Sequence, residues 1–189
     1  MKKRPLIAVI GDSSQDTMTE EKTRLSENLG EALISNGYRI ICGGLGGVMD
    51  SIAKGAKRSS NYQDGDLIGV LPGFDPEDAA DSIDIPIATG LQYARNIIIA
   101  NADAVVAIGG GAGTLSEIAL AWSMRRLVIA YRVEGWSGEL ADKVLDKRVR
   151  YPDIPEDRVY GVSKESEVID ILGNLSRYNK RTKGIVRRT

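Results

Sequence analysis

A glycine-rich turn with a glutamate behind it is the segment whose residue types and spacing best suit chemistry. It follows an apolar run, 105–108, that predicts a strand buried on both faces. A helix is expected to begin just after the turn, at Gly113 or Thr114, and the free N–H groups and positive dipole end of a helix favour phosphate. Glu117 lies one turn deeper in that helix, where it would meet whatever the phosphate carries. The alternative is a turn that is glycine-rich for structural reasons alone.

The segment also excludes several familiar kinds of site. A P-loop ends in Gly-Lys-Ser/Thr, whereas this turn ends in Gly-Thr without a lysine. Its spacing does not fit G-x-G-x-x-G, and the acidic residue expected about 20 residues later is missing. The chain contains no histidine, which excludes Ser-His-Asp and Cys-His systems and imidazole metal ligands. Acid–base chemistry would therefore depend on carboxylates, lysine, tyrosine or the ligand itself.

Two more turns rich in glycine or serine follow other expected strands. Gly-Asp-Ser-Ser at 11–14 follows a strand at 6–10, and Gly-Gly-Leu-Gly-Gly at 43–47 follows a strand at 39–42. The carboxyl ends of parallel strands meet at one edge of a sheet, so the three turns predict a nucleotide-sized groove there. The alternatives are helix capping by the serines and tight strand–helix packing at 43–47. The residues expected to contact the ligand are Gly11, Ser13, Ser14, Gly43, Gly44, Gly46, Gly47, Met49, Gly110, Gly111, Gly113 and Thr114.

The elements that must position these turns alternate between strand and helix. Further strands are expected at 67–71, 85–88, 127–131 and near Val159. Helices are expected at about 19–35, from the 43–47 turn to about 59, at 90–101, from the 109–113 turn to 124, at about 138–145 and at 164–175. This pattern predicts an α/β fold, a Rossmann-like doubly wound parallel sheet in three layers with right-handed crossovers. We expect one nucleotide-binding domain over 1–175 and a basic C-terminal tail over 176–189.

Composition limits the partners and the compartment. The 189 residues suit one α/β domain, and a formal net charge of −1 does not favour nucleic acid or a membrane as partner. A single cysteine, Cys42, excludes a disulfide framework and fits a reducing cytosol. The segment before the first expected strand is too short for a signal peptide or a membrane span. We therefore expect a cytoplasmic protein without a membrane partner.

Three segments together resemble the lonely-guy superfamily, whose members were once widely labelled "possible lysine decarboxylases". They are Gly-Gly-Leu-Gly-Gly-Val-Met-Asp at 43–50, Ala-Arg-Asn at 94–96 and the 109–117 segment. Characterised members hydrolyse the N-glycosidic bond of cytokinin riboside 5′-monophosphates. The resemblance implies a Rossmann-like fold and a homodimer or higher homo-oligomer with active sites near the interface. It also implies a catalytic arginine and glutamate, which fall on Arg95 and Glu117.

The chain departs from the hydrolases at three positions. Gly109 stands where they have proline, and Ala94 and Asn96 stand where they have glutamate and lysine. The segments are closer to a sister branch of uncharacterised proteins, which the molybdenum-cofactor carrier proteins resemble. Those carriers bind a pterin phosphate without hydrolysing a nucleotide. Decarboxylation is disfavoured, because no lysine for pyridoxal phosphate lies in the three turns.

Two functions stay open, and we expect no cofactor, and no metal for hydrolysis. The first is hydrolysis of a nucleoside 5′-monophosphate to free base and ribose 5-phosphate, through an oxocarbenium-like state. Glu117 would then stabilise the positive charge or accept a proton, and Arg95 would bind phosphate or hold Glu117. Asp12, Tyr93 or solvent would protonate the leaving base. The second is a non-catalytic carrier or sensor of a nucleotide-like ligand such as molybdenum cofactor. For Arg95 and Glu117 themselves, the plainest alternative is a structural ion pair.

Four further features support smaller predictions. Three consecutive isoleucines at 97–99 suggest burial against a partner subunit as well as the sheet. Trp136, expected in a loop, either stacks on a ligand ring or covers an edge of the core. Cys42 is expected as a small core residue rather than a reactive thiol. The basic run at 177–188 is expected as a solvated tail, with contact to nucleic acid or a phosphate as the alternative.

Overall fold

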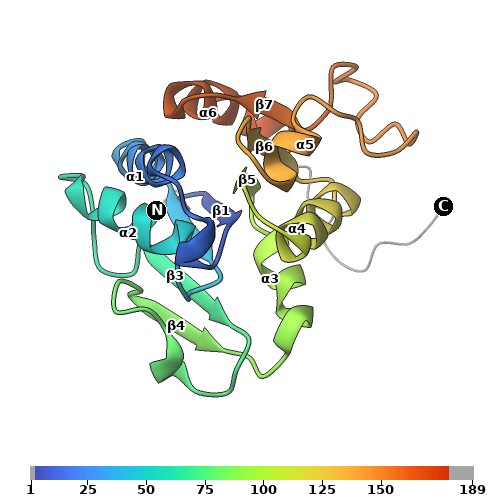
Figure 1. Ribbon diagram of the computed structural model, residues 1–189. Coiled ribbons are helices and arrows are strands. Elements are labelled where there is room, and N and C mark those ends of the chain that lie inside the picture. The colour runs from blue at the N-terminus through green and yellow to red at the C-terminus, as the bar shows by residue number, and fades with distance from the viewer. Residues whose placement is uncertain (1–2, 179–189) are drawn as a thin grey trace.

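The computed structural model describes residues 3–178 and contains one seven-stranded sheet (Figure 1). All neighbouring strands are parallel, and their order is β4-β3-β2-β1-β5-β6-β7. The chain winds outward from β1 to β4 and returns to the other side of β1 at β5, so the winding direction reverses between β1 and β5. The predicted doubly wound parallel sheet is confirmed. The strands are β1 (Leu6–Gly11), β2 (Arg39–Cys42), β3 (Leu67–Leu71), β4 (Ile85–Ala88), β5 (Ala104–Ile108), β6 (Leu127–Tyr131) and β7 (Tyr160–Val162).

Helices cover both faces of this sheet and give the three predicted layers (Figure 1). On one face lie α1 (Glu20–Ser35), α2 (Val48–Arg58) and α6 (Glu165–Leu172). On the other lie α3 (Asn96–Ala100), α4 (Ala112–Ser123) and α5 (Trp136–Leu140). Because both faces are covered, β5 and β6 are buried along their whole length and consist of apolar residues with one tyrosine. The short helices are η1 (Gln15–Thr17), η2 (Pro76–Asp78), η3 (Gln92–Arg95) and η4 (Leu175–Arg177).

Two glycines allow α1 and α2 to pack with their backbones in contact. A Cβ on Gly30 would lie 2.1 Å from the carbonyl oxygen of Ile52, and a Cβ on Gly55 would lie 1.8 Å from that of Glu27. Any larger residue would force the helices apart. This contact fixes α2 over the sheet, and with it the turn that joins β2 to α2.

The expected helices differ from the observed ones mainly between β4 and β5. The single helix expected at 90–101 is wrong: η3 is followed by the short α3. Gly90 and Gln92 both have positive φ (64° and 51°), which a continuous helix does not permit. The helix expected at 138–145 is α5, which begins earlier and ends at Leu140, because Ala141 is extended and Asp142 has a φ of 64°. The last helix ends at Leu172 rather than near residue 175.

Several smaller predictions can be checked at the core and at the C-terminal end. Cys42 is buried at the end of β2, as predicted, and burial raises the pKa of its thiol to about 11. Tyr178 is also buried, with its ring 5.1 Å from that of Tyr151. Residues 179–189, most of the expected basic tail, lie outside the described residues. No helix within residues 3–178 has the length and apolarity that a membrane span needs.

Candidate functional site

A groove of about 410 Å³ lies at the carboxyl ends of the central strands, where the strand order reverses. Its walls come from the ends of β1 and β2, from η3 and from the start of α4. Ligands in doubly wound sheets bind at this kind of position. Ten of the residues predicted to contact a ligand or to act on it line the groove: Gly11, Ser13, Ser14, Gly43, Met49, Arg95, Gly111, Gly113, Thr114 and Glu117.

Four predicted glycines do not line the groove, and three of them support the backbone around it. Gly44 and Gly47 have positive φ, and their Cβ positions would meet Leu71 Cδ2 at 2.8 Å and the Asp12 carbonyl oxygen at 2.2 Å. A Cβ on Gly110 would lie 2.1 Å from Oγ1 of Thr114. These contacts match the alternative of tight packing for 44 and 47. Gly46 is less crowded, with its nearest neighbours 3.5 Å away.

The start of α4 has the properties of a phosphate site. Gly111 is the N-cap residue and no side chain caps the helix, while the first helical hydrogen bond runs from Leu115 N to Gly111 O. The preceding N–H groups of 112–114 therefore have no partner within the helix. Cβ atoms on Gly111 and Gly113 would meet nothing within 4 Å, so there is room beside these groups for a ligand. The free N–H groups of 112–114 and the helix dipole together favour an anion.

The segment after β6 holds the glycine turn from behind. Trp136 N donates to Gly110 O (2.9 Å) and Ser137 N donates to Gly109 O (3.0 Å). The fully buried Ser137 hydroxyl donates to Tyr131 O (2.8 Å) and accepts from Gly109 N (2.7 Å). Trp136 therefore begins α5 rather than lying in a loop, and it is not one of the residues that line the groove. Sequence reasoning missed Ser137, because the residues it joins are far apart in the chain.

Arg95 and Glu117 meet in the wall of the groove. Arg95 Nη1 lies 3.6 Å from Glu117 Oε1, and the side chains are 15% and 8% exposed. The guanidinium packs against Gly43, where an added Cβ would lie 3.0 Å from Arg95 Nη2. Burial raises the pKa of Glu117 from 4.5 to about 7, although Arg95 opposes that rise. A carboxyl that titrates near neutral pH inside a groove can exchange a proton with a bound ligand.

Asn96, the neighbour of Arg95, joins α3 to α4. Its amide donates to Ser116 Oγ (2.9 Å), and that hydroxyl donates to Gly113 O (2.7 Å). Asn96 is 5% exposed and lines the groove. The connection fixes the arginine-bearing turn against the first turn of α4. Asn96 belongs to the Ala-Arg-Asn segment, but sequence reasoning did not include it among the contact residues.

A second ion pair, between Asp12 and Lys22, lies beside the glycine turn. Lys22 Nζ donates to Asp12 Oδ2 (2.8 Å) and to Thr17 O (3.1 Å). The side chains are 7% and 9% exposed for Lys22 and Asp12, and Asp12 lines the groove. Asp12 and Tyr93, which the sequence suggests only as proton donors, both line the groove, Tyr93 with 86% of its surface exposed. Lys22 had no sequence signal, because a lysine on an amphipathic helix normally faces solvent.

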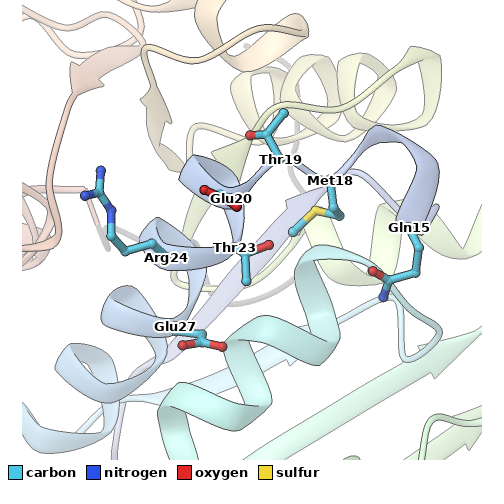
Figure 2. A pocket seen from close by; sticks show the side chains of 7 residues that line it. All are labelled: Gln15, Met18, Thr19, Glu20, Thr23, Arg24 and Glu27. Atoms are coloured by element: carbon cyan, nitrogen blue, oxygen red, sulfur yellow. The ribbon is translucent and has the colours of Figure 1, made fainter.

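Another hollow, of about 390 Å³, lies along η1 and the first turns of α1 (Figure 2). Figure 2 shows Arg24 pointing away from Glu20 and Glu27, so the charged side chains do not converge. Thr19 caps α1, with its Oγ1 accepting from Lys22 N, and Glu27 forms an ion pair with Arg58. The helix start is therefore already capped there, and the groove at the strand ends is the candidate site. The lining residues are Gln15, Met18, Thr19, Glu20, Thr23, Arg24 and Glu27.

Comparisons with known proteins show the family of this chain and solved structures with a similar fold. The model of the SLOG cluster4 family matches residues 4–159. An uncharacterized protein of Archaeoglobus fulgidus is 43% identical over 116 residues, which are 61% of this chain and 72% of that one. The molybdenum cofactor binding protein of Rippkaea orientalis superposes with a TM-score of 0.75 at 30% identity, covering 93% of this chain and 99% of that one. The molybdenum cofactor carrier protein of Chlamydomonas reinhardtii superposes with a TM-score of 0.71 at 28% identity, covering 92% and 99%.

Proposed function

Because the chain belongs to the SLOG cluster4 family, we propose that it binds a phosphorylated, nucleotide-like ligand in the groove at the carboxyl ends of β1, β2 and β5. The observation that carries this proposal is the uncapped start of α4, which opens into the groove beside Arg95. The phosphate would accept hydrogen bonds from the N–H groups of 112–114. Thr114, whose hydroxyl donates to Gly11 O (3.2 Å), would hold the turn against β1.

Two forms of this function differ in whether the ligand is changed. The carrier or sensor form is supported by two solved structures of similar proteins, which are described as binding or carrying molybdenum cofactor. They also confirm the predicted branch of the superfamily. The hydrolytic form is supported by Glu117, a buried carboxyl with a pKa of about 7 in the same groove. In that form the C1′–N bond of a nucleoside monophosphate would break and a water oxygen would bond to C1′. Glu117 would take a proton from that water, and Asp12, Tyr93 or solvent would protonate the leaving base.

One experiment separates the two forms. The native protein and the Glu117→Gln variant are incubated with a panel of nucleoside 5′-monophosphates, and released ribose 5-phosphate is measured beside the melting temperature. Release that is lost in Glu117→Gln establishes hydrolysis. Intact nucleotide together with a raised melting temperature establishes binding without turnover. If neither the nucleotides nor molybdenum cofactor bind, the proposed ligand class is wrong.

The protein is further proposed to work as a homodimer or a higher homo-oligomer in the cytoplasm. Within the isoleucine run, Ile99 is fully buried, whereas Ile97 and Ile98 are 49% and 40% exposed. Leu91, in the turn before η3, is 49% exposed as well. Apolar side chains grouped on one short segment beside the groove favour contact with another subunit.

A further inference from the structure

Asp12 is one of three candidate proton donors in the hydrolytic form, but neither form of the proposed function explains why Asp12 is paired with Lys22. The pair is also costly to build. Both side chains are less than a tenth exposed, and the loss of hydration of two buried charges offsets most of their attraction. Such a pair is therefore a weak source of stability. Its position beside the glycine turn, with the carboxylate in the groove wall, indicates a role in recognition.

The surrounding backbone holds the main chain of Asp12 on one side and leaves room for its carboxylate on the other. Val48 N donates to Asp12 O (2.9 Å), and a Cβ on Gly47 would lie only 2.2 Å from that oxygen. On the opposite side, a Cβ on Gly109 would lie 2.2 Å from Asp12 Oδ2. Glycine at 109 thus makes room for the carboxylate. The side chain is held in place before any ligand arrives, which lowers the entropy cost of using it.

The two carboxylate oxygens of Asp12 differ in their partners. Oδ2 accepts the hydrogen bond of Lys22. Oδ1 accepts no hydrogen bond from any residue in the described range 3–178. Since Asp12 lines the groove, a bound ligand can reach this second oxygen. A carboxylate oxygen attracts hydrogen-bond donors and repels phosphate.

We propose that Asp12 determines the specificity of the groove: its Oδ1 accepts a hydrogen bond from a sugar hydroxyl or an exocyclic ring amino group of the phosphorylated ligand, while Lys22 holds Oδ2. The proposal rests on the proposed function, because it takes the phosphate as bound at the start of α4. Two cations, Arg95 and Lys22, balance two carboxylates, Glu117 and Asp12, around the groove. A ligand with an anionic end and a donor-bearing end matches this arrangement.

The test compares ligands that differ only in the donor. Calorimetry measures the dissociation constants of AMP and GMP, of their analogues without the amino group (purine riboside 5′-monophosphate and IMP) and of their 2′,3′-dideoxy analogues. The native protein is expected to bind one class of analogue about tenfold more weakly or worse, because a hydrogen bond to a charged group is lost. Asp12→Asn is expected to remove most of that difference. If the native protein binds only the dideoxy analogues more weakly, Asp12 accepts from a sugar hydroxyl. If it binds only the analogues without the amino group more weakly, Asp12 accepts from that amino group.

Two further variants control for an unpaired buried lysine and for the loss of any carboxylate near the groove. Asp12→Asn leaves Lys22 buried without its partner, so the double variant Asp12→Asn/Lys22→Met removes both charges and is expected to lose the same discrimination. Glu20→Gln, an exposed change at the start of α1 outside the groove, is the matched control. If the Asp12 variants weaken every ligand equally, or keep the native discrimination, the inference is wrong while the proposed function stands. If the native protein binds none of these nucleotides but binds molybdenum cofactor, the inference is wrong while the proposed function stands. If it binds neither, both fail together.

Discussion

At the residue scale, the groove is defined by charges that have been moved out of water. Glu117 is the clearest example, because desolvation acts on it more strongly than the nearby guanidinium does. Asp12 shows the opposite solution, since its charge is matched by an ammonium 2.8 Å away. One buried carboxyl is thus adapted to proton exchange and the other to a close ion pair. This difference underlies the separate roles that we propose for them.

The raised pKa of Glu117 predicts a pH dependence of stability. The folded state favours the protonated carboxyl, so its contribution to stability is fully present below pH 4.5 and is lost as the pH rises through about 7. A shift from 4.5 to about 7 corresponds to about 3 kcal/mol at most. Urea denaturation of the native protein and Glu117→Gln between pH 4 and pH 8 measures this. As the pH rises, the free energy of unfolding of the native protein should fall relative to that of Glu117→Gln. A difference between the two that is independent of pH would contradict the assignment.

Ser137→Ala should damage both stability and ligand binding. The substitution leaves Gly109 N, just after β5, and Tyr131 O, at the end of β6, without their shared partner, and both residues are buried. We expect a loss of about 1 to 3 kcal/mol in the free energy of unfolding, and weaker phosphate binding because the turn is no longer held from behind. Denaturation and nucleotide titration check the two effects. Ser163→Ala, at an exposed position, is the control and should behave like the native protein.

At the scale of elements, the start of α4 is both part of a helix and the proposed phosphate site, and a single substitution can separate the two roles. Gly113 lies in its first turn, where glycine lowers helix stability and where an added Cβ would meet nothing. The same open space is the proposed position of the phosphate. The start of this helix therefore keeps a residue that suits a ligand better than it suits the helix.

Gly113→Ala is expected to leave the fold intact and to weaken ligand binding. Alanine in a helix is favoured over glycine by about 0.5 to 1 kcal/mol, so the melting temperature should stay the same or rise. The new methyl group would occupy the groove beside the N–H groups of 112–114, so nucleotide affinity should fall. Thermal unfolding and titration of the same preparation test both parts. Unchanged affinity would place the phosphate elsewhere.

At the scale of the whole molecule, the edge of the sheet at β4 is less covered than the central strands. The central strands are buried on both faces, whereas β4 at one edge is largely exposed. Ile85 and Ile87 on β4 and Phe74 before η2 add to the exposed apolar residues around η3 and α3. All seven strands belong to one sheet, which supports the proposal that residues 1–175 form one domain. The exposed edge supports assembly.

Ile98→Asp should disrupt the proposed oligomer without unfolding the chain. Ile98 is 40% exposed, so a charge there meets water in a monomer but is desolvated in a subunit contact. We expect light scattering coupled to gel filtration to give a multiple of 20.4 kDa for the native protein and a smaller mass for the variant. Val149→Asp, at a position 72% exposed outside η3 and α3, should keep the native mass. A native monomer would refute the assembly.

The sequence by itself determined the order of the elements and the place of the groove. Apolar runs such as 127–131 specify strands through local burial, and Thr19 and the Asn36-Gly37 pair specify the ends of α1. Glycine turns after parallel strands must meet at one edge, so ten of the predicted site residues line one groove. The family followed from the same turns, because their spacing is a property of the chain.

Only the tertiary structure decided which side chains meet there. Lys22 reaches Asp12, and Ser137 joins Gly109 to Tyr131, through folding of segments with no shared local pattern. Positive φ at Gly90 and Gln92 prevents a helix from starting where periodicity alone begins it. The pKa of Glu117 depends on burial by several elements at once. Local propensity sets where strands and turns lie along the chain, but desolvation and hydrogen bonding between distant residues exist only once the sheet is assembled.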